Sequence, residues 1–232
     1  MSEPRRILHL IDTPGPGGAE SVYLRLIDGL DAKRWRSIAA LLEPGWLTDR
    51  LEGRGVSPVV LESDRSFDLG FLIRLCRLAR RREIDLIQTH LLGSAVYGGL
   101  AGLLSGIPTV ATFHGAADLA DSSTLFRVKT QILRKAIRRV VFVSGSLRDE
   151  LMPVLGLSPE QTSVIPNGID LDAFHPRRGG GLRRELELDW NTLLLGAVGN
   201  IRRPKAYGDL LEAVALLRQD FSDFKLVIAG DE

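Results

Sequence analysis

Short apolar segments alternate with segments of helical periodicity along most of the chain. In the segment 19–30, apolar residues recur at the i, i+3, i+4 spacing of an amphipathic helix. A strand followed by a helix and another strand forms a right-handed unit that builds a mostly parallel sheet. We therefore predict an α/β, Rossmann-like fold with helices on both faces of the sheet. Its expected strands are 7–11, 37–42, 58–61, 85–89, 109–113, 140–143 and 163–165.

The sequence begins such a fold twice. The strand 7–11 leads through a glycine-rich loop into a helix, and the strand 193–198 leads through a second loop into another helix and a strand at 224–229. We predict an N-terminal domain over 1–170, a linker or hinge over 171–191, and a C-terminal domain over 192–232. We expect this second Rossmann-like unit to be incomplete, because the sequence stops soon after its second strand.

Composition excludes several classes of protein. The 232 residues carry a net charge of +1, which argues against nucleic acid as a partner. Cys76 is the one cysteine, so no internal disulfide can form, and we expect a cytoplasmic protein. The uncharged stretch 86–117 is broken by glycines, which favours a buried helix and strand over a membrane span.

Basic side chains gather in two segments, which allow two interpretations. The segments 74–82 and 127–139 are either solvated helix faces or a peripheral contact with the anionic inner face of the membrane. We favour the first and keep the second as an alternative.

Both strand-to-helix loops have features of an anion site. Gly17 and Gly18 precede a helix N-terminus, whose free N–H groups and dipole attract phosphate, although a plain turn explains them equally well. Arg202, Arg203 and Lys205 crowd the second loop, where cations oppose the helix dipole unless a diphosphate is bound. We therefore predict that these five residues bind phosphate.

Two histidines follow expected strands directly. His90 follows the strand 85–89, and His114 follows the strand 109–113. Ligands of open α/β sheets bind beyond the carboxyl ends of the strands, where both histidines fall, although most single histidines have structural roles. None of the four histidines has metal-ligand spacing, so we predict no protein metal site and no cofactor.

At these residues the chain resembles the retaining glycosyltransferases of family 4, which have the GT-B architecture. The resemblance runs the whole length, and the order and spacing of its motifs are more specific than any one of them. Its motifs are Gly17-Gly18-Ala19-Glu20, Thr89-His90, Phe113-His114-Gly115, Val143-Ser144, 164–170, 198–205 and 227–231.

The resemblance implies transfer of a sugar from a nucleotide diphosphate donor to an acceptor hydroxyl, with retention of the anomeric configuration. The expected acceptor is a glycan or a lipid-linked glycan of cell-surface synthesis. By this resemblance His114 is catalytic, near the transferred sugar, and Lys205 contacts the donor diphosphate. The acceptor-side residues would be Glu20, His90 and Asn167.

The chain departs from the family pattern at two positions. Asn200 stands where the family usually has arginine, which leaves Arg202 and Arg203 as alternative sources of the guanidinium, and Ala206 stands where it has glycine. The family's paired glutamates, and the carboxylate expected to hold the donor ribose, would lie beyond Glu232. We therefore expect little or no transfer by this chain alone.

Two other functions remain open. The chain could be a non-catalytic partner subunit of a split glycosyltransferase. It could also be a dinucleotide-dependent oxidoreductase, because Glu43 follows the second strand where a ribose-binding acid would lie. Glu20 argues against the oxidoreductase, since it occupies the place of the third glycine of the dinucleotide fingerprint.

Overall fold

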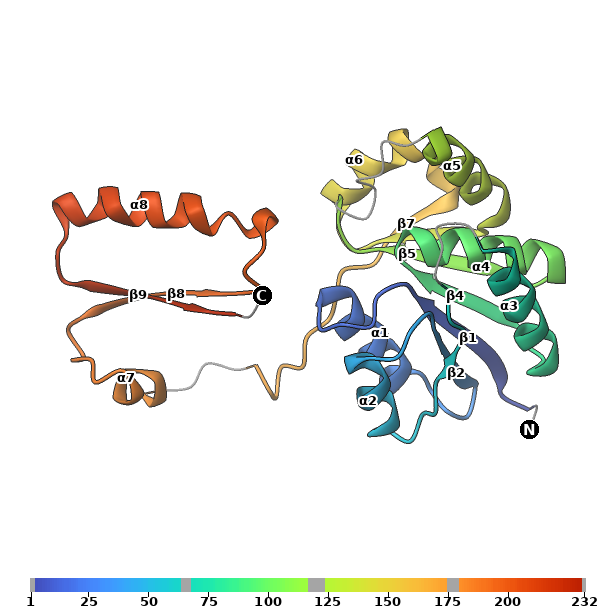
Figure 1. Ribbon diagram of the computed structural model, residues 1–232, viewed down its shortest axis with the longest axis horizontal. Helices are drawn as coiled ribbons and strands as arrows, with labels where there is room; N and C mark the ends of the chain where they lie inside the picture. Colours follow the sequence, from blue (N-terminus) through green and yellow to red (C-terminus); the bar gives the residue numbers. More distant parts are fainter. Residues whose placement is uncertain (1–2, 64–67, 117–123, 175–179, 231–232) are drawn as a thin grey trace. The chain divides into compact units, whose positions relative to one another are not determined.

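The computed structural model describes residues 3–63, 68–116, 124–174 and 180–230. The chain divides into two compact units, Met1–Gly168 and Ile169–Glu232, which are described separately below. Figure 1 shows the elements of both units.

The first unit is built on a seven-stranded sheet of order β3-β2-β1-β4-β5-β6-β7, in which every neighbouring pair is parallel. This confirms the predicted fold class and all seven expected strands. The segment 58–61 contributes only two residues to its ladder. The strands are β1 (Arg5–Ile11), β2 (Trp35–Leu41), β3 (Val59–Val60), β4 (Leu86–His90), β5 (Thr109–Phe113), β6 (Arg139–Phe142) and β7 (Thr162–Val164).

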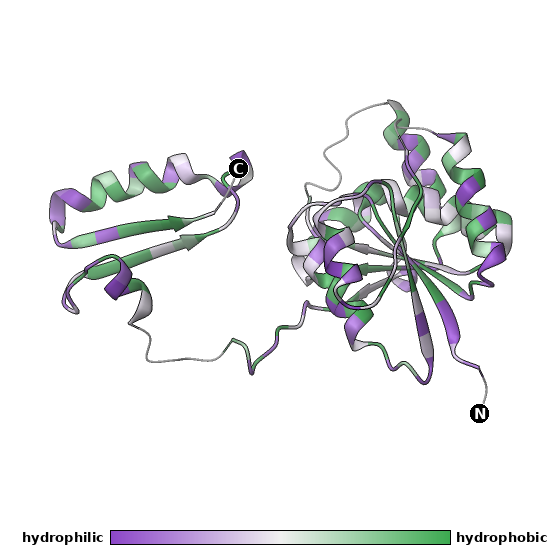
Figure 2. Ribbon diagram, turned by 60° about the horizontal axis from the view of Figure 1, so that its bottom comes forward, coloured by the Kyte–Doolittle hydropathy of each residue, from purple (hydrophilic) through white to green (hydrophobic). Residues whose placement is uncertain are grey.

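Helices cover both faces of this sheet, as predicted. On one face, α1 and α2 bury Tyr23, Leu47 and Leu51 against β1 and β2. On the other face, α3 and α4 bury Phe71 and Leu75 against β1 and β4. The helices of this unit are α1 (Gly18–Gly29), α2 (Trp46–Glu52), α3 (Leu69–Arg81), α4 (Leu92–Ser105), α5 (Thr124–Ala136) and α6 (Gly145–Leu155), with a short 3₁₀ turn at Pro159–Gln161. Figure 2 shows the strands largely in hydrophobic colours, as expected for a sheet covered on both faces.

The described part of the uncharged stretch, residues 86–116, contains β4, α4 and β5, as its pattern predicted. Glycine lets α4 lie close to the sheet: a Cβ on Gly98 would collide with the Thr89 side chain, and one on Gly102 would lie 2.6 Å from the carbonyl oxygen of Ile107. In the described part of the chain, no helix is long and apolar enough to cross a membrane.

The second unit contains a two-stranded parallel sheet among its described residues. It is formed by β8 (Leu193–Val198) and β9 (Phe224–Ala229), joined through a 3₁₀ turn at Arg203–Lys205 and α8 (Tyr207–Asp220) and preceded by α7 (Gly181–Glu185). Large apolar side chains of this unit are exposed, including Val198 at 87%, Leu216 and Phe221.

Candidate functional site

The carboxyl ends of β1, β4 and β5 meet at one edge of the first sheet. Strand register places Ile11 beside His90, and His90 beside Thr112. The loops that follow these strands therefore bring Asp12, His90 and His114 to one place, the edge at which parallel α/β sheets bind ligands.

His90 and His114 form a hydrogen-bonded pair. Nδ1 of His90 lies 2.9 Å from Nε2 of His114. The ring planes differ by 14° with centroids 5.1 Å apart, so the rings lie nearly edge to edge in one plane, as a linear hydrogen bond requires. The bond restrains the plane of the His114 ring, which therefore has a fixed orientation before any ligand arrives.

His90 is held in a dry environment. Its side chain is 1% exposed, and the ring of Tyr23 packs edge-on against it at a centroid distance of 5.4 Å. Burial, together with the nearby His114 and His9, lowers the pKa of His90 well below its usual value. His90 is therefore neutral at pH 7 and can supply one N–H and one lone pair. Among the described residues, its Nε2 has no hydrogen-bond partner.

Sequence reasoning missed two residues beside this pair. Leu91 has φ of +74°, a left-handed conformation that is strained for a leucine, in the turn between His90 and α4. Asp12 follows β1 and lies against the first turn of α4, where a Cβ on Gly93 would be 2.6 Å from its Oδ2. A carboxylate at a helix N-terminus complements the helix dipole. Neither feature has a local sequence signal, because each depends on the packing of β4 and α4.

The glycine-rich loop is occupied in part by Glu20 itself. Glu20 is 6% exposed and accepts a hydrogen bond from the Thr13 hydroxyl, and a Cβ on Gly17 would collide with its carboxylate. A Cβ on Gly18 would meet nothing within 4 Å. The negative charge of Glu20 at the start of α1 weighs against a phosphate at Gly17 and Gly18, and it favours a hydroxyl-bearing ligand there.

Asn167 is exposed and lies in the segment that follows β7. The guanidinium of Arg25 on α1 donates a 2.9 Å hydrogen bond to the carbonyl oxygen of Gly168. This bond holds the segment beside α1, whose first turn carries Glu20.

The second unit presents the predicted cationic loop. Arg202, Arg203 and Lys205 follow β8 and are exposed. The Tyr207 hydroxyl donates a 2.7 Å hydrogen bond to the carbonyl oxygen of Gly199, which ties the loop to the start of α8. Ala206 has φ of +51° and ψ of +39°, the left-handed region in which glycine is favoured. The structure therefore gives a conformational reason for a glycine at this position.

The predicted site residues thus form two groups. His90, His114, Gly17, Gly18 and Glu20 lie around the carboxyl edge of the first sheet, and the three cations lie in the second unit. The convergence of both groups on one ligand stays a prediction. Among the described residues, no group of three or more His, Cys, Asp or Glu side chains could hold a metal ion.

Comparison with known proteins identifies the family. The model of Glycosyltransferase Family 4 matches residues 16–173. The chain belongs to glycosyltransferase family 4. This family segment contains the glycine-rich loop, both histidines of the pair and Asn167.

The chain spans only part of the length of its family 4 relatives. It is 26% identical, over 97% of its length, to an Escherichia coli enzyme named UDP-Gal:alpha-D-GlcNAc-diphosphoundecaprenol alpha-1,3-galactosyltransferase, and covers 62% of that protein. It is 34% identical over 149 residues to a D-inositol 3-phosphate glycosyltransferase of Thermomonospora curvata, a match that covers 57% of this chain and 34% of the relative.

Solved structures share the fold. The Anabaena protein HepE in complex with UDP-glucose superimposes with a TM-score of 0.82 at 22% identity, covering 97% of this chain and 60% of that one. A glycosyltransferase from Rickettsia africae superimposes with a TM-score of 0.75 at 16% identity, covering 98% of this chain and 69% of that one. These similarities establish the GT-B-type fold, and the roles of individual side chains rest on the geometry above.

Proposed function

We propose that this chain forms the acceptor-side domain and the beginning of the donor-side domain of an enzyme that transfers a sugar from a nucleotide diphosphate sugar to an acceptor hydroxyl with retention. The observation that supports this most is the neutral, buried His90 bonded to His114 at the carboxyl edge of the sheet, inside the segment matched by the family.

His114 acts on the sugar in this proposal. A ring held in one plane can place a hydrogen bond on a hydroxyl of the transferred sugar without reorganisation during the reaction, and such fixed dipoles stabilise the charge of an oxocarbenium-like transition state. His90 is the positioning residue, since it is buried and acts through His114. Glu20 and Asn167 flank the place of the acceptor.

The cations of the second unit act on the donor. A leaving diphosphate develops negative charge, and Arg202, Arg203 and Lys205 would neutralise it. HepE, whose fold this chain shares, has been crystallised with UDP and glucose and with UDP-glucose, which supports a nucleotide sugar as the donor. No cofactor is required by this chemistry.

The acceptor is a glycan or a lipid-linked glycan of cell-surface synthesis in this proposal. The name of the E. coli relative specifies an acceptor sugar on diphosphoundecaprenol, which supports this class. An acceptor of that kind also supports a cytoplasmic enzyme that works at the inner face of the membrane. The basic segments would then provide peripheral contact.

The 232-residue chain has little transfer activity of its own in this proposal. The chain spans about 62% of the E. coli relative, and its second unit exposes Val198, Leu216 and Phe221. Such apolar surface needs further protein to cover it. The same exposed apolar surface supports the second candidate function, a partner subunit of a split glycosyltransferase.

Donor binding tests the proposal directly. The chain is titrated calorimetrically with UDP-glucose, and the variant Lys205→Gln is compared with Lys225→Gln, an exposed lysine on β9. Loss of one hydrogen bond to a charged group weakens binding roughly tenfold or more. We expect that loss for Lys205→Gln alone. Equal affinity of both variants would remove Lys205 from the donor site.

Transfer is tested in a chimera that completes residues 1–232 with the C-terminal part of the E. coli relative. Sugar transfer is followed by proton NMR, which also reports whether the anomeric configuration is retained. We expect transfer by the chimera, little by the chain alone, and a roughly 10- to 100-fold lower kcat for His114→Ala, since one hydrogen bond to the transition state is lost. Full activity of that variant would exclude His114 from the reaction.

A further inference from the structure

A basic pocket lies at the opposite end of the strands from the histidine pair. It has a volume of about 550 Å³ and is lined by the amino-terminal ends of β1 and β2, the segment 55–59 and the end of α3. Its cationic residues are Arg6, Arg36, Arg81 and Arg82. We propose that this pocket binds a phosphate-bearing anion at a second site, separate from the sugar-transfer site of this unit.

The strand register brings two of these arginines together. Arg6 on β1 and Arg36 on β2 are register partners in a parallel pair, so their side chains leave the sheet on the same face. Like charges directly opposite each other destabilise a sheet. Arg82 then adds a third guanidinium to the same hollow from the end of α3. Three guanidinium groups that repel one another reduce the stability of the fold, and such unfavourable arrangements are typical of binding sites, where a ligand compensates them.

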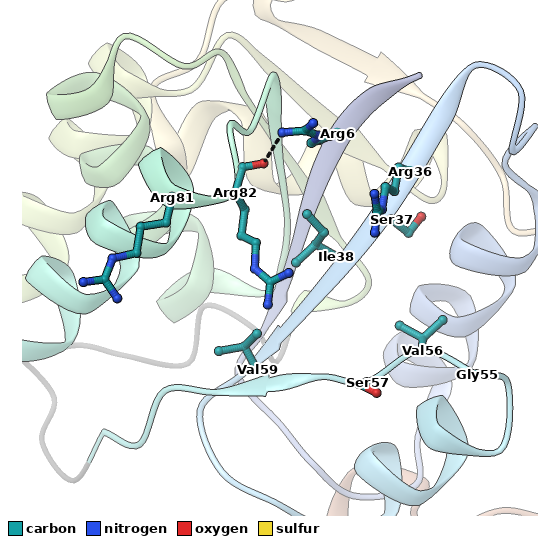
Figure 3. Close-up of a pocket in the computed structure, with 10 residues that line it drawn as sticks. All are labelled: Arg6, Arg36, Ser37, Ile38, Gly55, Val56, Ser57, Val59, Arg81 and Arg82. Atoms are coloured by element: carbon teal, nitrogen blue, oxygen red, sulfur yellow. Dashed lines mark hydrogen bonds between the residues drawn. The ribbon is translucent and has the colours of Figure 1, made fainter. Parts of the chain in front are cut away.

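Carboxylates of the protein compensate only part of this charge. Arg6 is paired with Glu83 and, at 3.9 Å, with Glu3, and it donates a 3.2 Å hydrogen bond to the carbonyl oxygen of Arg82, the dashed line in Figure 3. Within the described residues, neither Arg36 nor Arg82 forms an ion pair. Their charge is therefore available to an anion from solution.

The shape of the pocket fits a small ligand. Figure 3 shows the Arg82 side chain extending toward Ile38 and Val59, whereas Arg81 points away from the strands. Ile38 and Val59 add apolar side chains to the lining, and Ser57 adds a hydroxyl group. A volume of about 550 Å³ is that of a small-molecule site rather than a nucleic-acid groove. Guanidinium groups match the oxygens of a phosphate with two parallel hydrogen bonds, which makes phosphate the anion of choice.

Another hollow of this unit, of about 720 Å³, shows the contrast. It is lined by Arg134 and Lys135 in the last turn of α5, by Arg138 and by Arg139 at the start of β6, but also by Glu160. Arg139 donates hydrogen bonds to the carbonyl oxygens of Glu160 and Thr162, at 2.9 and 3.3 Å. The protein itself therefore occupies part of the Arg139 guanidinium there, which leaves fewer donors for an anion.

The test uses inorganic pyrophosphate and lipid vesicles as probes. All proteins carry Arg202→Gln, Arg203→Gln and Lys205→Gln, which remove the three cations of the loop in the second unit. In that background, Arg36→Gln and Arg82→Gln remove the proposed contacts, and Arg80→Gln is the matched control, because Arg80 is exposed on α3 and does not line the pocket. Circular dichroism confirms that each variant is folded.

We expect the Kd for pyrophosphate, measured by calorimetry, to rise about tenfold in Arg36→Gln and in Arg82→Gln and to stay unchanged in Arg80→Gln. Co-sedimentation with phosphatidylglycerol vesicles, against phosphatidylcholine vesicles, identifies the source of the phosphate. A parallel loss of phosphatidylglycerol binding in the same two variants assigns a lipid headgroup, and an unchanged vesicle fraction assigns a soluble phosphate compound. If neither probe binds, or if Arg80→Gln weakens binding as much as the other two, the proposal is wrong.

Discussion

The imidazole rings of His90 and His114 share a hydrogen bond of 2.9 Å although 24 residues separate them in the sequence. One ring is buried and neutral, and the other lies on the glycine-containing loop after β5. The pair therefore links a rigid strand end to a loop that the proposed reaction needs in one orientation.

The role of His90 can be separated from simple packing by two substitutions. The amide of asparagine can take the place of Nδ1, so His90→Asn keeps a hydrogen bond to His114, whereas His90→Phe fills the space without one. We expect the ¹⁵N chemical shift of Nε2 of His114 to stay near the wild-type value in His90→Asn and to move toward that of a free imidazole in His90→Phe. Identical spectra for the two variants would show that the bond does not orient His114.

The stability of the first unit should fall in mild acid because of His9. Burial lowers the pKa of His9 from 6.5 to about 4, so the unfolded chain binds a proton in this range and the folded unit does not. His9 therefore does not reduce the free energy of unfolding above pH 6.5, and it reduces it progressively as the pH falls from 6.5 toward 4. Since one pKa unit corresponds to about 1.4 kcal/mol, the loss is on the order of 3 kcal/mol.

Urea unfolding at several pH values measures this effect. Trp35 and Trp46 report on the first unit once Trp190 is replaced by phenylalanine. The variant His9→Leu should show a shallower dependence on pH. His90 shifts in the same direction, so part of the dependence remains. A slope that does not change in His9→Leu would contradict the assignment.

The two glycines before α1 should respond in opposite ways to alanine. A Cβ on Gly17 collides with the Glu20 carboxylate, which must then move and lose its hydrogen bond from Thr13, so Gly17→Ala should destabilise the first unit by about 1 kcal/mol. A Cβ on Gly18 meets nothing, and alanine at the first helical position should leave stability equal or raise it by up to about 1 kcal/mol.

A double variant provides the control for this pair. In a Glu20→Ala background the colliding carboxylate is absent, so Gly17→Ala should lose most of its effect on the free energy of unfolding. If the two substitutions prove additive in thermal unfolding, the contact between Gly17 and Glu20 is not the cause.

Replacing Ala206 by glycine should stabilise the start of α8. Its left-handed backbone is strained with a Cβ, and Ala206→Gly should raise the opening free energy of α8 by about 1 kcal/mol. Ala213→Gly, in the exposed interior of the same helix, should lower it by about 1 kcal/mol. Hydrogen exchange of the α8 amides measures the opening free energy in both variants. A loss of protection in Ala206→Gly would contradict the prediction.

Local patterns were sufficient to predict much of the fold. Apolar runs and helical spacing gave the seven strands and the helices between them, and the strand-end positions of His90 and His114 placed both at one edge. The sheet order and the pairing of Arg6 with Arg36 could not be predicted, because register depends on contacts distant in sequence. The left-handed Leu91 and the contact between Asp12 and α4 escaped prediction for the same reason: leucine and aspartate carry no signal for either.

The strained turn at Leu91 restricts how this protein can change. A glycine there would remove the strain, yet it would also lose the packing of the Leu91 side chain against the cluster around Tyr23 and loosen the strand end that carries His90. The leucine therefore trades backbone strain for a fixed connection between β4 and α4, and a substitution at this position changes both at once.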